Sequence, residues 1–151
     1  MKFAAYRLFA DGDAIAGRVT EMSIDDLSPG DVVIRKAFSS VNYKDALAGL
    51  GRNKIIRDYP RIGGIDLFGT VTESRDLRFK SGDRVIAHGF GIGVDHDGGH
   101  AEYARVKSDW VMPLPDGLTL KDAAVIGVAG YTAALSIHLM ELNGLEPSRG
   151  P

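Results

Sequence analysis

Cysteine is absent from all 151 residues of this chain. Without cysteine the chain can form neither a disulfide nor a thiolate zinc site, and it offers no cysteine nucleophile. A strong positive charge is also missing, because the formal net charge is -2 at pH 7. We therefore expect no nucleic-acid partner. These features fit a protein of the cytoplasm, which is the location that we expect.

Long apolar runs are also lacking. Arg7 interrupts the apolar N-terminus, which has no signal-peptide pattern, and no segment approaches the ~18 apolar residues of a membrane-spanning helix. We therefore expect no membrane partner. The chain is long enough for one domain with a core of its own, or for one domain and part of a second.

Glycine, in contrast, is abundant, and its 19 residues are scattered without a repeat. Such glycines indicate many turns between short strands. The pattern predicts seven or eight strands before Gly117. They include a hairpin of Lys2–Phe9 and Ala16–Met22, a strand at 32–38 and an alternating strand that begins at Asp66. This spacing favours a compact β-barrel-like domain over alternating βαβ units.

Helices are predicted after Gly117. We expect Thr119 to cap a short helix, and residues 128–143 to form a longer one that Gly144 ends. The longer helix is apolar on more than one face, which indicates burial between two layers or two domains. Residues 146–151 are turn-rich like a linker, so the chain looks cut off.

Polar residues gather where the strand at 32–38 gives way to a short helix at 42–50, which begins with Asn42, Tyr43, Lys44 and Asp45. An Asn at a helix start is commonly only an N-cap, and a Lys and an Asp there are commonly a solvated face. We expect Lys44 and Asp45 to pair with each other. A basic run follows, and a solvated loop and an anion-binding surface explain it about equally well: Arg52, Lys54, Arg57 and Arg61.

Candidate metal ligands occur in the glycine-rich segment at 89–100, namely Asp95, His96, Asp97 and His100. Their spacing matches no specific zinc pattern. We expect this segment to be a long, flexible and solvated loop.

Five motifs follow one another in order: Asn42-Tyr43-Lys44-Asp45, Gly64-Ile65-Asp66-Leu67-Phe68-Gly69-Thr70-Val71, Gly82-Asp83-Arg84-Val85, Gly99-His100-Ala101-Glu102-Tyr103 and Gly127-Val128-Ala129-Gly130-Tyr131-Thr132-Ala133. With them the chain resembles the medium-chain dehydrogenase/reductase superfamily, and within it the zinc-independent quinone oxidoreductases and acrylyl-CoA reductases. The resemblance implies a mainly β, GroES-like, partly open barrel over residues 1–125. It implies an interdomain helix and linker over 126–151, leading toward a Rossmann domain that these residues do not include.

The resemblance also implies chemistry without zinc. Zinc-dependent relatives place a cysteine where this chain has Asn42, and Gly-His-Glu where it has Gly64-Ile65-Asp66. Without a Lewis acid, alcohol oxidation loses its main electrostatic support, whereas hydride addition to an activated C=C bond does not need one.

The implied activity is NADPH-dependent reduction of a conjugated C=C bond, in an acrylyl-CoA-like enoyl thioester or in a quinone. Asn42 and Tyr43 are expected against the nicotinamide and ribose, as the catalytic pair, with Tyr43 a candidate proton donor. Thr132 is expected near the cofactor, and Asp66 at the rim of the substrate site. The phosphates of a CoA ester are expected to meet three basic residues, Arg52, Lys54 and Arg57.

An alternative from another class stays open, that the chain is a non-catalytic GroES-like folding or interaction module. Without a Rossmann half it would bind NADPH weakly or not at all. The residues do not separate quinones from enoyl thioesters, although Asn42-Tyr43-Lys44-Asp45 with Gly64-Ile65-Asp66 favours acrylyl-CoA. The resemblance implies a homodimer for a full-length protein. For this chain the oligomeric state stays open between a monomer and a self-associating chain, because the apolar face of the helix at 128–143 is a liability for self-association.

Overall fold

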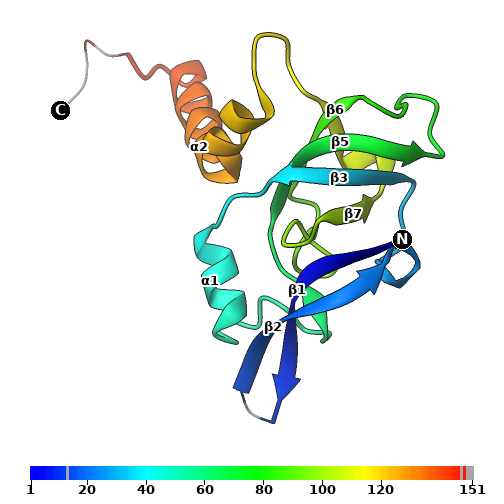
Figure 1. Cartoon of the computed structure of the whole chain (residues 1–151). Coiled ribbons are helices and arrows are strands. Elements are labelled where there is room, and N and C mark those ends of the chain that lie inside the picture. The colour runs from blue at the N-terminus through cyan, green and yellow to red at the C-terminus, as the bar shows by residue number, and fades with distance from the viewer. Residues whose placement is uncertain (13, 147, 149–151) are drawn as a thin grey trace.

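The computed structural model describes residues 1–12, 14–146 and 148. Within these residues, eight strands form two antiparallel sheets and two α-helices lie at one side of them (Figure 1). The mainly β, partly open barrel that the sequence predicts is confirmed.

The smaller sheet has the strand order β2-β1-β4. Its strands are β1 (Lys2–Asp11), β2 (Ala14–Ser23) and β4 (Arg61–Ile62). The predicted hairpin is confirmed, with β1 and β2 paired from Lys2↔Ser23 to Asp11↔Ala14. β4 was not predicted from the sequence; it begins at Arg61, the last residue of the basic run.

The larger sheet has the order β7-β3-β5-β6-β8. Its strands are β3 (Val32–Phe38), β5 (Asp66–Ser74), β6 (Arg84–His88), β7 (Tyr103–Val106) and β8 (Val111–Pro113). Alternation along β3 and β5 turns Val32, Ile34, Leu67 and Val71 into the main core. Two short 3₁₀-helices that the sequence did not predict are Ile24–Asp26 and Ser108–Trp110.

The first helix, α1 (Tyr43–Gly49), follows β3 through a short polar loop. Its buried Ala48 packs with Leu8 of β1 and with Ile56, which comes from the loop after the helix. This small cluster attaches both α1 and the loop at 52–58 to the smaller sheet.

The second helix, α2 (Leu120–Leu142), replaces the two helices that the sequence predicts. Thr119 caps it as expected, with its hydroxyl oxygen 3.1 Å from the donating N–H of Asp122. Gly127 has φ 55° and ψ -169°, which are not helical, so the two predicted segments remain recognisable as two halves joined at a kink. The kink lies next to the predicted boundary at residue 125.

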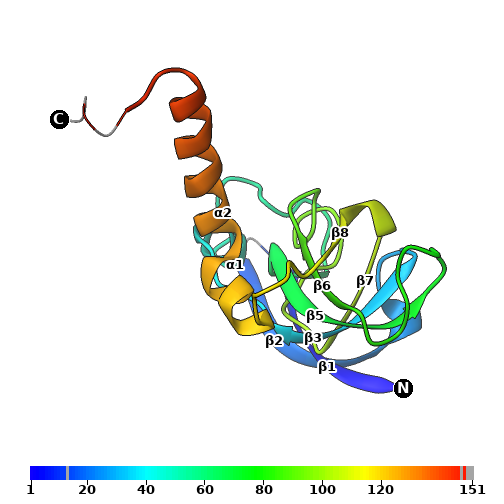
Figure 2. The same cartoon turned by 90° about the horizontal axis from the view of Figure 1, so that it is seen from above.

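The two halves of α2 have different surroundings. The helix contacts β3, β5 and β6, and beyond the kink it extends away from the sheets (Figure 2). There Leu135, Leu139 and Leu142 are exposed in this chain instead of being buried between layers. By length and composition α2 is also apolar enough to cross a membrane, so the expectation that no segment meets this criterion is wrong. Its exposed apolar side chains are equally those of a helix that packs against another domain.

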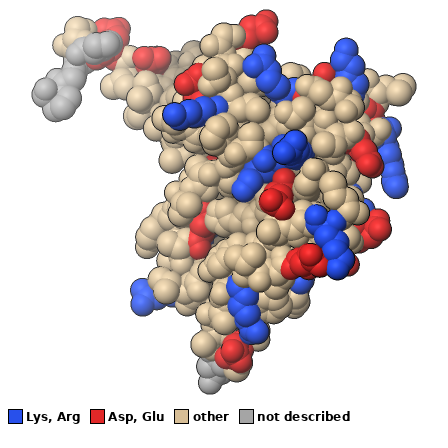
Figure 3. Space-filling model, in the orientation of Figure 1, with Lys and Arg blue, Asp and Glu red and all other residues tan. Residues whose placement is uncertain are grey.

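Charged side chains of both signs are interspersed over the face shown in Figure 3. This mixture agrees with a net charge close to zero. Any recognition of an anion must therefore depend on a local group of basic residues.

Candidate functional site

Asp66 is the first residue of β5, and its side chain is completely buried. Its carboxylate accepts hydrogen bonds from the backbone N–H of Ser40 at 2.7 Å, from the Ser40 hydroxyl and from Nδ2 of Asn42 at 3.3 Å. The backbone N–H of Val128 lies 3.4 Å from the same carboxylate. The expectation that Asp66 lies at the rim of the site is therefore wrong, because donors from two segments, the loop before α1 and α2, surround its buried carboxylate.

Asn42 is the N-cap of α1, and its backbone N–H donates to the carboxylate of Asp45 at 2.8 Å. The second oxygen of Asp45 accepts from the N–H of Gly64 at 3.1 Å. Asp45 thus holds the helix start, as expected, but it makes no ion pair with Lys44 in the described residues. The predicted Lys44–Asp45 pair is wrong, because Asp45 points back to Asn42 and Gly64.

Gly127 allows α2 to approach this junction closely. A Cβ atom at Gly127 would lie 3.1 Å from Oγ of Ser40 and 3.6 Å from Oδ2 of Asp66, and its φ of 55° is in the left-handed region. The kink therefore brings the start of the second half of α2 onto the Asp66 carboxylate. This N-terminal end of a helical segment is favourable for a negative charge.

His88 and Tyr131 lie beside Asp66. His88 ends β6 directly across from Asp66, and its ring is 5.0 Å from the ring of Tyr131 on α2. Burial lowers the pKa of His88, and the nearby charge of Asp66 acts in the opposite direction. Neither residue was assigned to the site from the sequence, since only pairing of β6 with β5 and packing of α2 bring them there.

The two other residues predicted to meet the cofactor lie on either side of this junction. Tyr43 is 80% exposed, and no hydrogen bond occupies its hydroxyl in the described part of the chain. Thr132 is exposed in the second half of α2, where its hydroxyl donates to the carbonyl of Val128 at 2.8 Å. Asp66 links their elements, because it bonds Asn42 next to Tyr43 and Val128 one turn before Thr132.

The predicted basic residues do not all come together. Lys54 and Arg57 line a pocket of about 230 Å³ together with Lys44, whereas Arg52 is exposed and lies outside that pocket. Arg61 belongs to a different environment, where its guanidinium is 3.6 Å from the Asp97 carboxylate.

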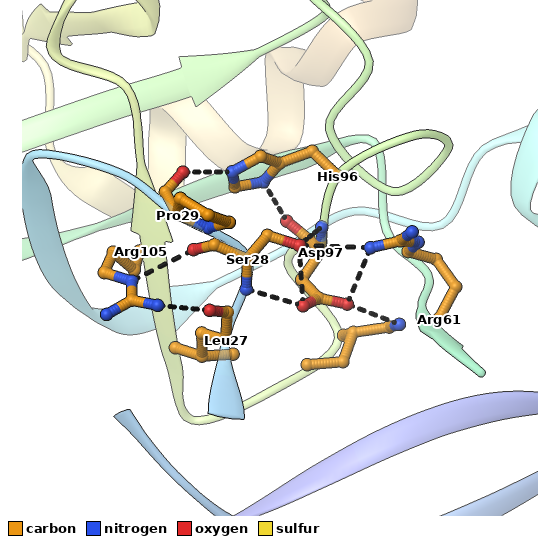
Figure 4. Close-up of polar contacts among 8 residues, drawn as sticks. Leu27, Ser28, Pro29, Arg61, His96, Asp97 and Arg105 are labelled. Atoms are coloured by element: carbon orange, nitrogen blue, oxygen red, sulfur yellow. Dashed lines mark hydrogen bonds and ion pairs between the residues drawn. The ribbon is translucent and has the colours of Figure 1, made fainter. Parts of the chain in front are cut away.

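The segment at 89–100 is not the solvated loop that the sequence predicts, since His96 and Asp97 are both buried. The Asp97 carboxylate accepts from the N–H and the hydroxyl of Ser28, both at 2.9 Å, and from the N–H of Ile62 at 3.1 Å (Figure 4). Arg61 donates to the Ser28 hydroxyl oxygen at 3.0 Å. Asp97 therefore joins three segments of the fold.

The ring of His96 likewise has partners within the fold. Its ring nitrogens lie 2.9 Å from the carbonyl oxygen of Pro29 and 3.1 Å from that of Asp97, and Trp110 packs against the ring. His100 lines a different pocket, between β1 and α1. Among the described residues, no group of three or more His, Cys, Asp or Glu is arranged to hold a metal ion.

The positions that bind zinc in zinc-dependent relatives do not fit this metal here. Position 42 carries an amide, Ile65 has no donor atom, and the carboxylate of Asp66 already receives N–H and O–H donors. An oxygen that accepts from several donors has little capacity left for a cation.

Comparison with known proteins agrees with this fold. The family described as "Alcohol dehydrogenase GroES-like domain" matches residues 28–116. The acrylyl-CoA reductase AcuI of Ruegeria pomeroyi is 40% identical over 148 residues, which cover 95% of this chain and 45% of that protein. The chain thus spans less than half the length of the curated relatives that it matches.

Solved structures show the same partial coverage. The yhdH oxidoreductase of Salmonella enterica, in complex with NADP, has a TM-score of 0.95 and 44% identity, covering 99% of this chain and 46% of that one. The Bacillus subtilis protein yhfP, whose curated name is putative quinone oxidoreductase, was solved with NAD bound. It has a TM-score of 0.95 and 49% identity, covering 99% of this chain and 46% of that one.

Proposed function

The chain belongs to the alcohol dehydrogenase GroES-like domain family within the medium-chain dehydrogenase/reductase superfamily, and on this basis we propose that it is the catalytic part of an NADPH-dependent reductase. The proposed reaction is reduction of the conjugated C=C bond of an acrylyl-CoA-like enoyl thioester or of a quinone, without zinc. The observation that carries the proposal is the Asp66 junction, where one carboxylate contacts both Asn42 and Val128, the start of the second half of α2. The apolar side chains of that half are exposed and available to a second domain.

The cofactor would supply a hydride to the β-carbon of the substrate. What this chain must supply is a surface for the nicotinamide and stabilisation of the negative charge on the substrate's carbonyl oxygen. We assign the cofactor contacts to Asn42, Tyr43 and Thr132. The relatives solved with NADP and with NAD support a nicotinamide cofactor, and NADPH is our choice between the two.

Tyr43 has the chemistry to hold or deliver a proton. Its phenol is exposed and has no hydrogen-bond partner among the described residues, so it is free to approach a bound substrate. Asn42 is the opposite case, because its Nδ2 also donates to Oγ of Ser40 at 2.9 Å and is thereby fixed in place. We therefore assign Asn42 to orientation and Tyr43 to proton transfer.

Asp66 has a different role from the one that its sequence position suggests. Because the side chain is buried beneath Ser40, Asn42 and Val128, it acts through these groups and does not contact the substrate. We propose that Asp66 positions Asn42. Arg52, Lys54 and Arg57 remain the proposed contacts of the substrate's phosphates.

The test is transient kinetics of NADPH oxidation with the full-length protein that carries this chain. Tyr43→Phe is expected to slow reduction about 100-fold, in the range of general acid catalysis. Asn42→Ala is expected to raise KM for the cofactor and to lower kcat. The exposed Lys80, at a distant turn, provides the control Lys80→Gln. Rates equal to the wild type in both site variants would remove these residues from the active roles.

The second candidate function is a non-catalytic module, and the exposed outer half of α2 favours it for this chain in isolation. We expect weak or no NADPH binding by the 151-residue chain alone. Calorimetry checks this, and a submicromolar dissociation constant would contradict it. We further propose a cytoplasmic protein that forms a homodimer at full length, in which α2 packs against the cofactor-binding half.

A further inference from the structure

His88 lies on the face of the larger sheet that α2 covers. It is the last residue of β6, and Val85 and Ala87 of the same strand point into the main core, so the side chain of His88 points to the opposite face. Asp66 is its direct partner in the β5–β6 pair, and directly paired residues share a face of the sheet. The helix α2 contacts both strands (Figure 2). His88 is therefore next to the Asp66 junction.

The ring of His88 is held in place, but its nitrogens have no partner. Tyr131 of α2 packs on it with the ring centroids 5.0 Å apart, and His88 is half-buried. In the described part of the chain, no hydrogen bond or ion pair involves either ring nitrogen. Neither nitrogen is sealed from solvent, in contrast to Nε2 of His100. The hydrogen-bonding capacity of His88 is therefore open to a bound molecule.

The other side-chain donors around Asp66 are already in use. Nδ2 of Asn42 has two hydrogens and two acceptors, which are Oγ of Ser40 at 2.9 Å and the Asp66 carboxylate at 3.3 Å. The Ser40 hydroxyl donates to the same carboxylate. Tyr43 is uncommitted, but it is 80% exposed and nothing in the described structure fixes its hydroxyl. His88 differs from these three residues because it is both held and uncommitted.

The neutral form of the imidazole suits the role of a donor. Burial lowers the pKa of His88 and so favours this form, while the charge of Asp66 acts in the opposite direction. A neutral imidazole has one N–H donor and one acceptor nitrogen. Such a ring can polarise a carbonyl group without giving up its proton. Its effect is greatest where the donor is preorganised and water is excluded.

We propose that His88 donates a hydrogen bond to the carbonyl oxygen of the substrate and stabilises the negative charge that forms there. The inference rests on the proposed function, and it supplies the donor that the proposed reaction needs. When a hydride adds to the β-carbon of an enoyl thioester, the electron pair of the C=C bond moves toward the carbonyl group, and the carbonyl oxygen becomes negative. Reduction of a quinone likewise leaves negative charge on a carbonyl oxygen.

The proton of His88 stays on the ring in this step. The carbon next to the carbonyl group takes its proton from a separate donor, for which Tyr43 is proposed. His88 is then a catalytic residue, since it contacts the substrate. Tyr131 is a positioning residue, because it acts by holding the His88 ring from the side of α2.

The experiment uses the full-length protein that carries this chain. His88→Leu and His88→Met remove the donor, and two apolar variants are made so that the result does not depend on the folding of one. His88→Gln keeps an N–H donor, and Lys80→Gln is the control. The first readout is NADPH oxidation with an enoyl-CoA and with a benzoquinone. The second needs no turnover, and it is the infrared C=O stretch of a bound saturated thioester with an isotope-labelled carbonyl group.

We expect kcat to fall about 100-fold in the two apolar variants, as for loss of one preorganised donor, with KM for NADPH unchanged. His88→Gln should keep kcat within about tenfold of the wild type, because its amide N–H replaces that of the imidazole. The labelled C=O stretch should lie at a higher frequency in the apolar variants than in the wild type, because a hydrogen bond to the oxygen weakens the C=O bond.

Wild-type kcat in both apolar variants, or a C=O stretch that does not change, would overturn the inference. A loss of kcat in Tyr131→Phe with none in His88→Leu would also overturn it, since Tyr131 would then be the donor. Failure of the proposed function is a distinct result, in which the wild type oxidises NADPH with neither substrate. The inference then falls together with the function on which it rests.

Discussion

At the scale of single residues, the carboxylate of Asp66 joins β5 to the loop before α1 and to α2. Asp66→Ala leaves the donors of Ser40, Asn42 and Val128 without a charged acceptor. We expect the free energy of unfolding to fall by about 3 kcal/mol, the cost typical of losing hydrogen bonds to a buried charge. Urea unfolding measures this.

A matched control for this prediction is Asp25→Ala, because Asp25 is exposed. Its effect should stay within about 0.5 kcal/mol, as for ordinary surface positions. If Asp66→Ala were as mild as Asp25→Ala, Asp66 would not be the link between these elements.

His88 makes stability depend on pH in a defined direction. Burial lowers its pKa in the folded state from the ordinary value of 6.5, so the unfolded chain binds the proton more readily. The stability that neutral His88 contributes to the folded state is fully present above about pH 6.5, and it is lost as the pH falls through the folded-state pKa. His88→Gln should therefore reduce the loss of stability between pH 7.5 and pH 5.5, measured by denaturant midpoints.

His138→Gln, at an exposed position on α2, is measured in parallel as the control for replacing a histidine. Identical slopes for His88→Gln and the wild type would contradict the prediction.

The sequence predicted some roles of single residues and missed others for a physical reason. Thr119 was predicted as a cap, and a cap was one of the two interpretations of Asn42, because a cap depends on residues within one helical turn. The burial of Asp66 was missed because its donors lie 26 and 62 residues away, in Ser40 and Val128. A pattern along one strand gives the residue's place in the strand but not the partners that fold over it.

At the scale of elements, the kink of α2 depends on Gly127. Gly127→Ala places a methyl group 3.1 Å from Oγ of Ser40 and forces a side-chain residue into φ 55°. We expect a loss of about 2 kcal/mol in the free energy of unfolding, from left-handed strain and crowding together. Chemical denaturation is the measurement.

Gly49→Ala is the suitable counterpart, since Gly49 ends α1 and a Cβ there meets nothing within 4 Å. Alanine is the better helix former, so this change should be neutral or stabilising by up to about 1 kcal/mol. Equal destabilisation by both substitutions would mean that the kink has no special need for glycine.

Most strands and helices were predicted from local sequence patterns. The segments that were missed share one cause, which is that their structure depends on distant residues. The strands at 32–38 and from Asp66 onward alternate or carry β-branched residues, so they were predicted with accurate bounds. β4 has two residues, which pair with Arg7 and Leu8 of β1. A strand of two residues is too short to create a periodic pattern in the sequence. The segment at 89–100 looked solvated because its polar residues face inward only after Ser28 and Pro29 approach them.

At the scale of the whole molecule, the outer half of α2 exposes Leu135, Leu139 and Leu142. An apolar face of this kind promotes association when nothing covers it. We expect the isolated chain to self-associate with increasing concentration, and Leu139→Lys to reduce that association. Sedimentation velocity over a range of concentrations is the measurement.

Leu77→Lys is the control, because Leu77 is fully exposed in a loop away from α2. It should leave the association constant unchanged. A chain that stays monomeric at every concentration, or two variants with the same effect, would contradict a role for the helix face.

The order of strands in the larger sheet has a consequence for synthesis of the protein. β3 lies between β5 and β7, and Val32 pairs with Val106. On the ribosome, β3 therefore waits for a neighbour that is made on the order of ten seconds later at ordinary translation rates. During that time its apolar residues and unpaired backbone groups are open to other chains. A chaperone that protects nascent chains would have its greatest effect in this interval, before residue 106 emerges.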